Sequence, residues 1–211
     1  MTNIAVLASG RGSNFRALCM AQRKDGLSGG KIRVLITDKA EAGAIETAGE
    51  FGIETVVMPP KDFPSREKHD EAVVKTLEER SIGLVCLAGY MRILSPAFIS
   101  RFPGRIINIH PALLPSFPGL HGPKQAFEYG VKISGATVHF ANEGCDTGEV
   151  IIQAAVPVEE GDTEGSLAAR ILEAEHRLYP QAVRLFCENR LKIEGRRVSI
   201  LPPSTQGAGK T

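Results

Sequence analysis

Seven short runs rich in Val, Ile and Leu alternate along this chain with longer segments of helical character. A parallel sheet covered by helices produces this alternation, because each strand must be followed by a crossover connection before the next parallel strand. Most of the runs are continuously apolar, as expected of strands buried on both faces. The sequence therefore predicts an α/β fold, a Rossmann-like, doubly wound and mostly parallel sheet of about seven strands flanked by helices. The predicted strands are residues 4–8, 32–37, 54–58, 84–88, 106–109, 136–140 and 150–158.

Helical patterns fill most intervals between these strands. The predicted helices are residues 14–25, 43–51 and 66–80, a short one from residue 96, and a long one at residues 163–188. A length of 211 residues fits one domain, which we expect at residues 1–200, followed by a flexible tail at residues 201–211. Residues 110–130 contain four prolines and three glycines, a composition too irregular for one long element. Loops of that length commonly carry function.

The charge balance narrows the class of partner. Charged residues make up 23% of the chain, hydrophobic residues 43%, and the net charge is +1, so no strong field draws nucleic acid or anionic membranes. We therefore expect small-molecule partners, no nucleic acid and no membrane. The chain has no long apolar run and no basic leader pattern, which predicts a cytoplasmic protein. Its four cysteines and five histidines show no metal-ligand spacing, so no metal is expected. The sequence is compatible with a monomer or a homodimer.

A glycine-rich turn joins the first predicted strand to the first predicted helix. Gly10 and Gly12 permit a tight turn, and Gly12, Ser13 and Asn14 can direct donors from the helix N-terminus at a phosphate. Neither the dinucleotide pattern G-x-G-x-x-G nor the G-x-x-x-x-G-K-[ST] loop is present, so one phosphate fits better than a pyrophosphate. The alternative is a plain strand-to-helix turn with a polar cap.

Asn108 and His110 lie two residues apart at the end of the strand predicted at residues 106–109, so their side chains share a face. An amide can donate to a developing oxyanion, and an imidazole can donate a hydrogen bond or move a proton, which suits acyl transfer. A structural histidine before Pro111 is the alternative. Asp146 lies in a glycine-punctuated turn, where it either caps its own backbone or stabilises a nearby imidazolium and raises the pKa of that histidine.

Five segments in this order resemble the phosphoribosylglycinamide formyltransferase family, folate-dependent enzymes of purine synthesis. They are residues 9–14 (SGRGSN), 87–95 (LAGYMRILS), 108–115 (NIHPALLP), 119–121 (GLH) and 146–148 (DTG). The resemblance extends from residue 4 to about residue 203. It implies that the N-terminal half binds the nucleotide phosphate and that the C-terminal half binds folate and performs catalysis.

The resemblance also implies roles for individual residues. Asn108, His110 and Asp146 would be catalytic. Gly12, Ser13 and Asn14 would hold the substrate phosphate, and Glu175, which otherwise reads as part of a solvated helix face, would contact the ribose hydroxyls. The residues implied to bind folate are Arg66, Met91, Arg92, Ile93, Leu94, Asn108, Asn142, Glu143, Gly144, Cys145 and Asp146. Cys145 stands where relatives can have a larger aliphatic residue. A cis peptide bond is implied between Leu114 and Pro115.

The implied reaction transfers a formyl group from 10-formyltetrahydrofolate to the amine of glycinamide ribonucleotide, with the folate as co-substrate and without a metal. Asn108 and protonated His110 would stabilise the oxyanion, while Asp146 would keep His110 protonated and relay a proton through water. Two related alternatives are a formyltetrahydrofolate hydrolase and another folate-dependent formyltransferase with the same core, such as one acting on methionyl-tRNA, both expected to be longer. A catalytically inert nucleotide-binding module is a third.

Overall fold

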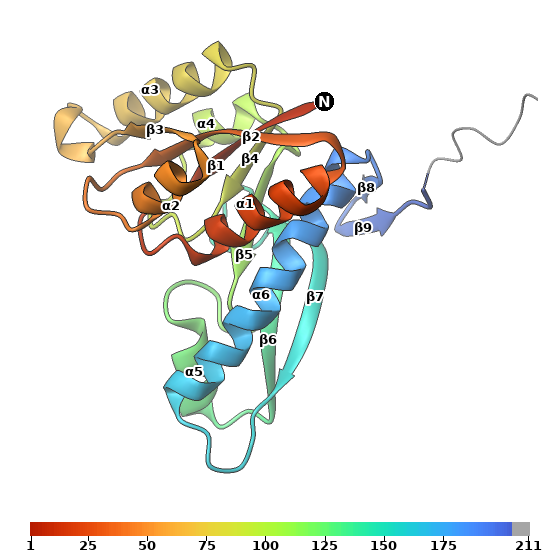
Figure 1. Cartoon of the computed structure of the whole chain (residues 1–211). Coiled ribbons are helices and arrows are strands. Elements are labelled where there is room, and N and C mark those ends of the chain that lie inside the picture. Colours follow the sequence, from red (N-terminus) through yellow and green to blue (C-terminus); the bar gives the residue numbers. More distant parts are fainter. Residues whose placement is uncertain (204–211) are drawn as a thin grey trace, which may run out of the picture.

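A seven-stranded sheet runs through the molecule in the order β3-β2-β1-β4-β5-β6-β7 (Figure 1). The computed structural model describes residues 1–203. Strands β1 to β5 pair in parallel, whereas β6 is antiparallel to both β5 and β7. The strands are β1 (Thr2–Leu7), β2 (Gly30–Thr37), β3 (Glu54–Val57), β4 (Leu84–Leu87), β5 (Ile106–His110), β6 (Ile133–Phe140) and β7 (Val150–Pro157). The predicted α/β fold with a mostly parallel sheet of seven strands is confirmed.

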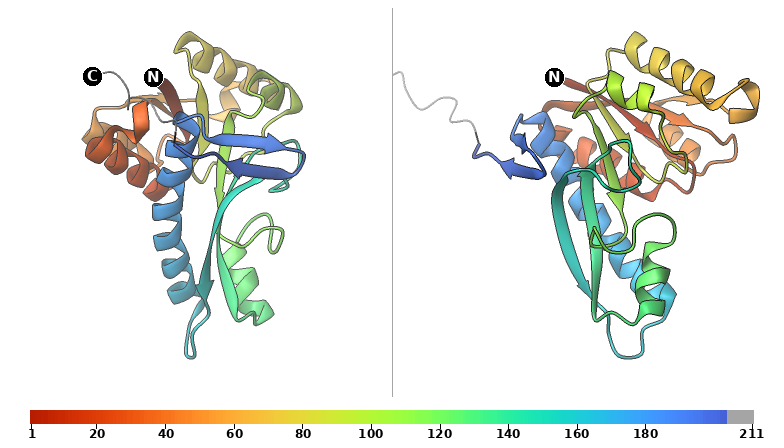
Figure 2. Two further views of the ribbon diagram at one scale, coloured as in Figure 1. Left: turned by 90° about the vertical axis from the view of Figure 1, so that its right-hand side faces the viewer. Right: turned by 180° about the vertical axis from the view of Figure 1, so that it is seen from behind.

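Helices cover both faces of this sheet, as the two views of Figure 2 show. They are α1 (Ser13–Asp25), α2 (Ala44–Phe51), α3 (Arg66–Glu79), α4 (Pro96–Arg101), α5 (Gly122–Tyr129) and α6 (Glu164–Cys187), with short 3₁₀ turns at Gly26–Gly29 and Pro60–Asp62. Alternation along β1 assigns the faces: Ile4 and Val6 pack with α1, α2 and α6, whereas Ala5 and Leu7 pack with α3 and α4. Both faces of the central strands are therefore buried, which explains their continuous apolar runs.

Besides the short 3₁₀ turns, one α-helix and one β-hairpin are absent from the sequence prediction. Helix α5 lies within residues 110–130, where Pro and Gly were interpreted as loop signals. Pro123 sits in the first turn of the helix and Gly130 caps its end, the two positions at which these residues favour a helix. The second is a hairpin of β8 (Leu191–Glu194) and β9 (Arg197–Ile200), whose largely exposed residues give no apolar run. The strand prediction missed this hairpin because it relies on the apolar runs that buried strands produce.

Helix α6 fixes the strand ends that carry the predicted site. The hydroxyl oxygen of Tyr179 lies 2.8 Å from the carbonyl oxygen of Leu87 and 3.0 Å from that of Ile107, so its single hydrogen is shared between β4 and β5 inside the core. The side chain of Tyr179 is fully buried, and a buried hydroxyl with this geometry rigidifies its acceptors. Asn108 follows Ile107 directly, so its backbone is held by the same contact.

The end of the described chain is tied back to the domain. The amide of Leu201 donates to the carbonyl of Arg190 at 2.8 Å, and the Arg190 guanidinium donates to the Leu201 carbonyl at 2.7 Å. From residue 204 onward, the tail predicted at residues 201–211 lies outside the described residues. Among residues 1–203, no helix is long and apolar enough to cross a membrane.

Candidate active site

The three residues predicted to be catalytic lie together in space. Asp146 Oδ2 lies 3.3 Å from His110 Nδ1, and Asp146 Oδ1 accepts a hydrogen bond from Asn108 Nδ2 at 3.3 Å. Asn108 and His110 end β5, and Asp146 reaches them from the turn between β6 and β7, where its φ of 52° is unusual for a residue other than glycine. A carboxylate thus joins an amide and an imidazole 38 and 36 positions away.

A fourth side chain, His139, belongs to the same cluster and was not predicted. Its Nε2 lies 3.1 Å from Asn108 Nδ2 and 3.5 Å from Asp146 Oδ1, while its Nδ1 lies 2.8 Å from the carbonyl oxygen of Phe140. His139 pairs with Asn108 across the antiparallel β5–β6 ladder. The strand prediction for residues 136–140 contained His139, but only the register between the two strands shows that it faces Asn108.

The loop after β5 contacts this cluster through its backbone. The carbonyl oxygen of Phe117 lies 2.8 Å from His110 Nε2, and the amide of Gly119 donates to Asp146 Oδ2 at 2.8 Å. A carbonyl and a carboxylate can only accept, so both nitrogens of His110 face acceptors and only the imidazolium form satisfies both. The implied cis peptide bond between Leu114 and Pro115 in this loop is confirmed.

Burial opposes that charge. Burial of the His110 side chain lowers its pKa below the usual value of 6.5, and Asp146 and the Phe117 carbonyl counteract the shift only in part. The sequence interpretation, in which Asp146 raises the pKa of this histidine, gives the correct sign for Asp146 but omits the larger effect of burial. Burial of Asp146 by itself would raise its pKa, but the His139 and Gly119 hydrogen bonds and the charge of His110 lower it to about 2. Asp146 is therefore ionised at neutral pH.

The predicted phosphate loop precedes α1 as expected. Gly12 has φ 78° and is buried, so the chain turns there in a conformation that glycine favours. Asn14 Nδ2 donates to Glu175 Oε2 at 2.9 Å, which brings together two of the residues implied to bind the ribonucleotide. Glu175 is 6% exposed, so its reading as a solvated surface residue is wrong. Burial raises its pKa to about 7, against a smaller lowering by Asn14.

The first segment predicted to bind folate, residues 91–94, lies shortly after the end of β4. Met91 and Ile93 are 61% and 65% exposed, whereas Leu94 is buried. The Met91 amide donates to Ser9 Oγ at 3.0 Å, and Arg66 Nη2 donates to the Leu94 carbonyl at 2.8 Å. Arg66 and this segment are therefore neighbours, as a shared ligand requires.

The second predicted folate segment is the turn that carries Asp146. Asn142 Oδ1 accepts from the Gly144 amide at 3.1 Å and from the Thr147 hydroxyl at 2.8 Å, which folds the turn on itself. Glu143, Gly144 and Cys145 are exposed at its tip. From the unpredicted hairpin, Arg196 Nη1 donates to the Thr147 carbonyl at 3.0 Å. The hairpin thus supports the turn next to Asp146.

Comparison with known proteins assigns the chain to a family. The family model described as formyl transferase matches residues 2–183. The chain belongs to this family. The predicted resemblance to formyltransferases is therefore confirmed.

Named relatives of this formyl transferase chain include a phosphoribosylglycinamide formyltransferase of nearly the same length. The chain is 41% identical over 213 residues to the phosphoribosylglycinamide formyltransferase of Escherichia coli (strain K12), covering 98% of this chain and 99% of that protein. It is 48% identical over 191 residues to the trifunctional purine biosynthetic protein adenosine-3 of Drosophila pseudoobscura pseudoobscura, covering 90% of this chain but spanning only 14% of that protein's length. The crystal structure of glycinamide ribonucleotide transformylase 1 from Symbiobacterium toebii superposes with a TM-score of 0.93 at 50% identity, covering 96% of this chain and 95% of that one.

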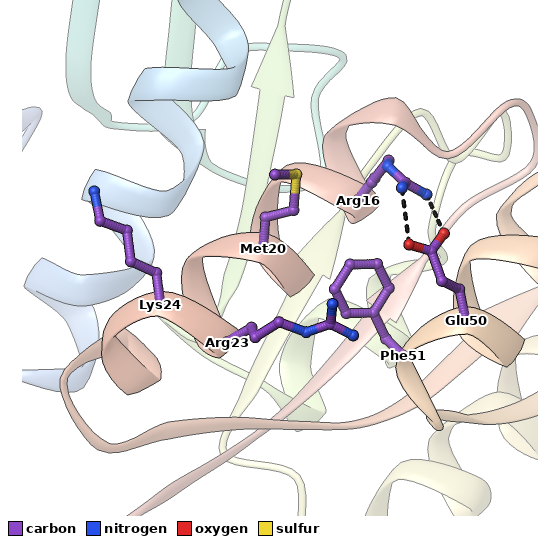
Figure 3. Close-up of a pocket in the computed structure, with 6 residues that line it drawn as sticks. All are labelled: Arg16, Met20, Arg23, Lys24, Glu50 and Phe51. Atoms are coloured by element: carbon purple, nitrogen blue, oxygen red, sulfur yellow. Dashed lines mark hydrogen bonds and ion pairs between the residues drawn. The ribbon is translucent and has the colours of Figure 1, made fainter.

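This formyl transferase also carries a surface cavity of about 340 Å³ between α1 and α2 (Figure 3). It is lined by Arg16, Met20, Arg23, Lys24, Glu50 and Phe51, none of which belongs to the predicted site. Arg16 and Glu50 form a two-pronged ion pair, and the Arg23 guanidinium lies 4.3 Å from the centre of the Phe51 ring. These contacts join α1 to α2 and thereby hold the helix that begins at the phosphate loop.

Metal ligands are scarce in the described part of this formyl transferase. Within residues 1–203, no group of three or more His, Cys, Asp or Glu side chains is placed to hold a metal ion. Cys19 and Cys86 are buried, Cys187 is half-buried and Cys145 is exposed, and all four are free thiols in this part of the chain. That the reaction proceeds without a metal stays a prediction.

Proposed function

We propose that this chain transfers the formyl group of 10-formyltetrahydrofolate to the amine of glycinamide ribonucleotide in de novo purine synthesis. The products are formylglycinamide ribonucleotide and tetrahydrofolate. The observation that carries the proposal is the convergence of Asn108, His110 and Asp146 in a chain whose near full-length relative is a phosphoribosylglycinamide formyltransferase. An inert nucleotide-binding module would have no need of a buried imidazole set against an ionised carboxylate.

The chemistry follows from what these side chains can donate. Attack of the substrate amine on the formyl carbon places negative charge on the formyl oxygen, and Asn108 and the imidazolium of His110 donate hydrogen bonds to it. Asp146 favours the charged form of His110, which burial disfavours, and accepts the proton lost by the attacking amine, through water, for delivery to N10 of the folate. The Phe117 carbonyl now faces the Nε2–H of His110, so the formyl oxygen replaces it when substrate binds.

The substrates are proposed to bind on either side of this cluster. The Gly12, Ser13 and Asn14 backbone holds the phosphate at the N-terminus of α1, and Glu175 beside Asn14 accepts from the ribose hydroxyls. The folate lies along Met91, Arg92, Ile93 and Leu94, with Arg66 on one side and the Asn142 to Asp146 turn on the other. The folate is a co-substrate, and we propose no metal.

A coupled assay tests the proposal. Purified protein is mixed with 10-formyltetrahydrofolate and glycinamide ribonucleotide, and tetrahydrofolate and the formylated ribonucleotide are quantified together. Equal amounts of both products are expected. Formation of tetrahydrofolate and formate without the ribonucleotide would instead identify a formyltetrahydrofolate hydrolase. Formylation of methionyl-tRNA would identify the other enzyme with this core.

Three further predictions accompany this function. We infer that residues 1–200 act as one formyltransferase domain, with the nucleotide bound mainly by the N-terminal half and the folate by the C-terminal half. We place the reaction in the cytoplasm, with small-molecule substrates and without nucleic acid. The oligomeric state is predicted to be a monomer or a homodimer. Light scattering at assay concentration distinguishes the two.

A further inference from the structure

One peptide group beside the proposed folate segment is held at both ends by helix α3. Arg66 Nη2 donates to the Leu94 carbonyl at 2.8 Å, and Asp70 Oδ2 accepts from the Ser95 amide at 2.7 Å. The Leu94 carbonyl and the Ser95 amide belong to the same peptide group. Arg66 and Asp70 lie four residues apart and therefore on one face of α3. A donor and an acceptor thus fix the orientation of this single peptide plane.

The acceptor in this arrangement is a buried carboxyl group. Asp70 is 4% exposed and Ser95 is also 4% exposed. Taking a carboxylate out of water is unfavourable unless hydrogen bonds compensate for it, so a residue chosen for packing alone would be apolar. His69, which is fully buried, lies with Nδ1 3.5 Å from Asp70 Oδ1 and Nε2 3.0 Å from the Met58 carbonyl. The carboxylate is therefore oriented toward the Ser95 amide.

The other end of the folate segment is held by the turn after β1. Ser9 Oγ accepts from the Met91 amide at 3.0 Å, and the Ser9 amide donates to the Gly89 carbonyl at 3.1 Å. Residues 91–94 are consequently held at both ends, while the side chains of Met91 and Ile93 remain exposed. A segment held in this way presents its backbone groups in a fixed geometry.

We propose that Asp70 is a positioning residue for the formyl donor. Together with Arg66 it fixes the Leu94–Ser95 peptide group, and through it the backbone of residues 91–94 against which the folate is placed. Arg66 uses one of its five N–H groups here and keeps others for the ligand. The proposal rests on the proposed function, because it takes these residues as the folate segment.

The kinetic test compares Asp70→Ala with Asp70→Asn, which keeps an acceptor oxygen at the same place. A preorganised segment lowers the KM of the ligand it contacts, so Asp70→Ala should raise the folate KM about 10- to 100-fold. The ribonucleotide KM should change less than about twofold, and Asp70→Asn should recover most of the loss. The control is Glu71→Ala on the same helix, which removes only an exposed ion pair with Lys68 and should behave as the wild type.

Two readouts do not depend on turnover. Amide hydrogen exchange at Ser95 should be slow in the wild type and in Glu71→Ala, and about tenfold faster or more in Asp70→Ala. Calorimetry with 5-formyltetrahydrofolate should show weaker binding to Asp70→Ala and unchanged binding to Glu71→Ala. If the wild type binds this folate but formylates no ribonucleotide, the proposed function is wrong. The calorimetry would still show whether Asp70 is needed for folate binding.

Circular dichroism and thermal melting verify that each variant is folded. A folded Asp70→Ala protein with wild-type folate affinity would overturn the proposal. An equal rise in both KM values would also overturn it, because that result describes a general disturbance of the sheet edge. If Asp70→Ala does not fold, Asp70→Leu, which has a similar size but no acceptor, takes its place, with Ser95 exchange as the deciding measurement. Wild-type exchange and wild-type folate affinity in folded Asp70→Leu would overturn the proposal.

Discussion

At the scale of single residues, the charge of His110 is set by two opposing effects. Burial lowers its pKa, and Asp146 and the Phe117 carbonyl raise it. Asp146→Asn removes the strongest opposing charge, so we expect the pKa of His110 to fall further below 6.5. The activity should drop roughly 10²- to 10⁴-fold. As pH rises, the remaining activity should be lost at a lower pH than in the wild type, because His110 loses its proton at a lower pH. Histidine NMR titration and pH–rate profiles of both proteins measure this.

The same titration can contradict the pairing. An unchanged His110 pKa in Asp146→Asn would mean that the 3.3 Å contact carries little electrostatic coupling. The role of Asp146 would then be limited to the turn at residues 142–146 that is proposed to contact the folate. This conclusion requires that Asp146→Asn is folded. We expect it to fold, because Asn has the shape of Asp and can still accept from the Gly119 amide.

Asn108 offers a second prediction at this scale. Its Nδ2 donates to Asp146 and faces His139, so the amide is already oriented before substrate binds. Asn108→Ala should lower kcat by roughly 10²- to 10³-fold, the usual effect of losing one preorganised oxyanion donor. Both KM values should change little, which steady-state kinetics would measure. A change confined to KM would show that Asn108 only positions substrate.

At the scale of elements, the start of α1 depends on close contact with α2. A Cβ atom at Gly12 would lie 2.6 Å from Ala44 Cα and 2.8 Å from Ala44 Cβ, and the φ of Gly12 is 78°. Gly12→Val should therefore displace the phosphate loop from α2 and raise the ribonucleotide KM about tenfold or more, with a folate KM within about twofold of the wild type. Kinetics with each substrate varied in turn test the split.

Gly10→Ala is the matched control for this change. A Cβ atom at Gly10 meets nothing within 4 Å, so the loop should keep its place and both KM values should stay near those of the wild type. Equal effects of Gly12→Val on both substrates would count against a phosphate bound at this helix N-terminus.

The same scale shows what sequence reasoning can reach. Strands β1, β4 and β5 and the second half of β2 are buried on both faces, so their composition alone marks them. The proximity of Asn108 and His110 follows from strand alternation. The place of His139 does not, because it depends on which residue of β6 pairs with Asn108. The burial of Glu175 depends on how α6 packs against α1, and the burial that lowers the His110 pKa depends on the loop above it.

At the scale of the whole molecule, α6 connects segments far apart in the sequence. Glu175 joins Asn14 across 161 positions, and Arg184 pairs with Asp25 at the other end of α1. Tyr179 between them holds β4 and β5. Glu175, which is proposed to bind the ribose hydroxyls, is therefore also a buried acid within this packing. Its protonation is linked to the stability of the chain.

That linkage gives a prediction with a definite sign. Burial raises the pKa of Glu175 from 4.5 to about 7, so between these values the folded protein holds a proton that the unfolded chain has lost. The contribution of Glu175 to the free energy of unfolding should therefore fall as pH rises from about 4.5 to about 7, by about 1.4 kcal/mol per unit of pKa difference, or about 3 kcal/mol in all. Glu175→Gln removes the ionisable group. Relative to the wild type, we expect this variant to gain up to about 3 kcal/mol between pH 4.5 and pH 8.

Urea unfolding at several pH values measures the difference, with Glu173→Gln, an exposed glutamate of the same helix, as the control. Glu173→Gln should follow the wild-type curve. If Glu175 binds the ribose as a carboxylate, Glu175→Gln should also weaken inhibition by ribose 5-phosphate more than inhibition by 2-deoxyribose 5-phosphate. A variant whose stability runs parallel to the wild type at every pH would show that Glu175 ionises freely in the folded protein. That result would contradict the expected energetic cost of ionising a carboxyl group that is 6% exposed and accepts from Asn14.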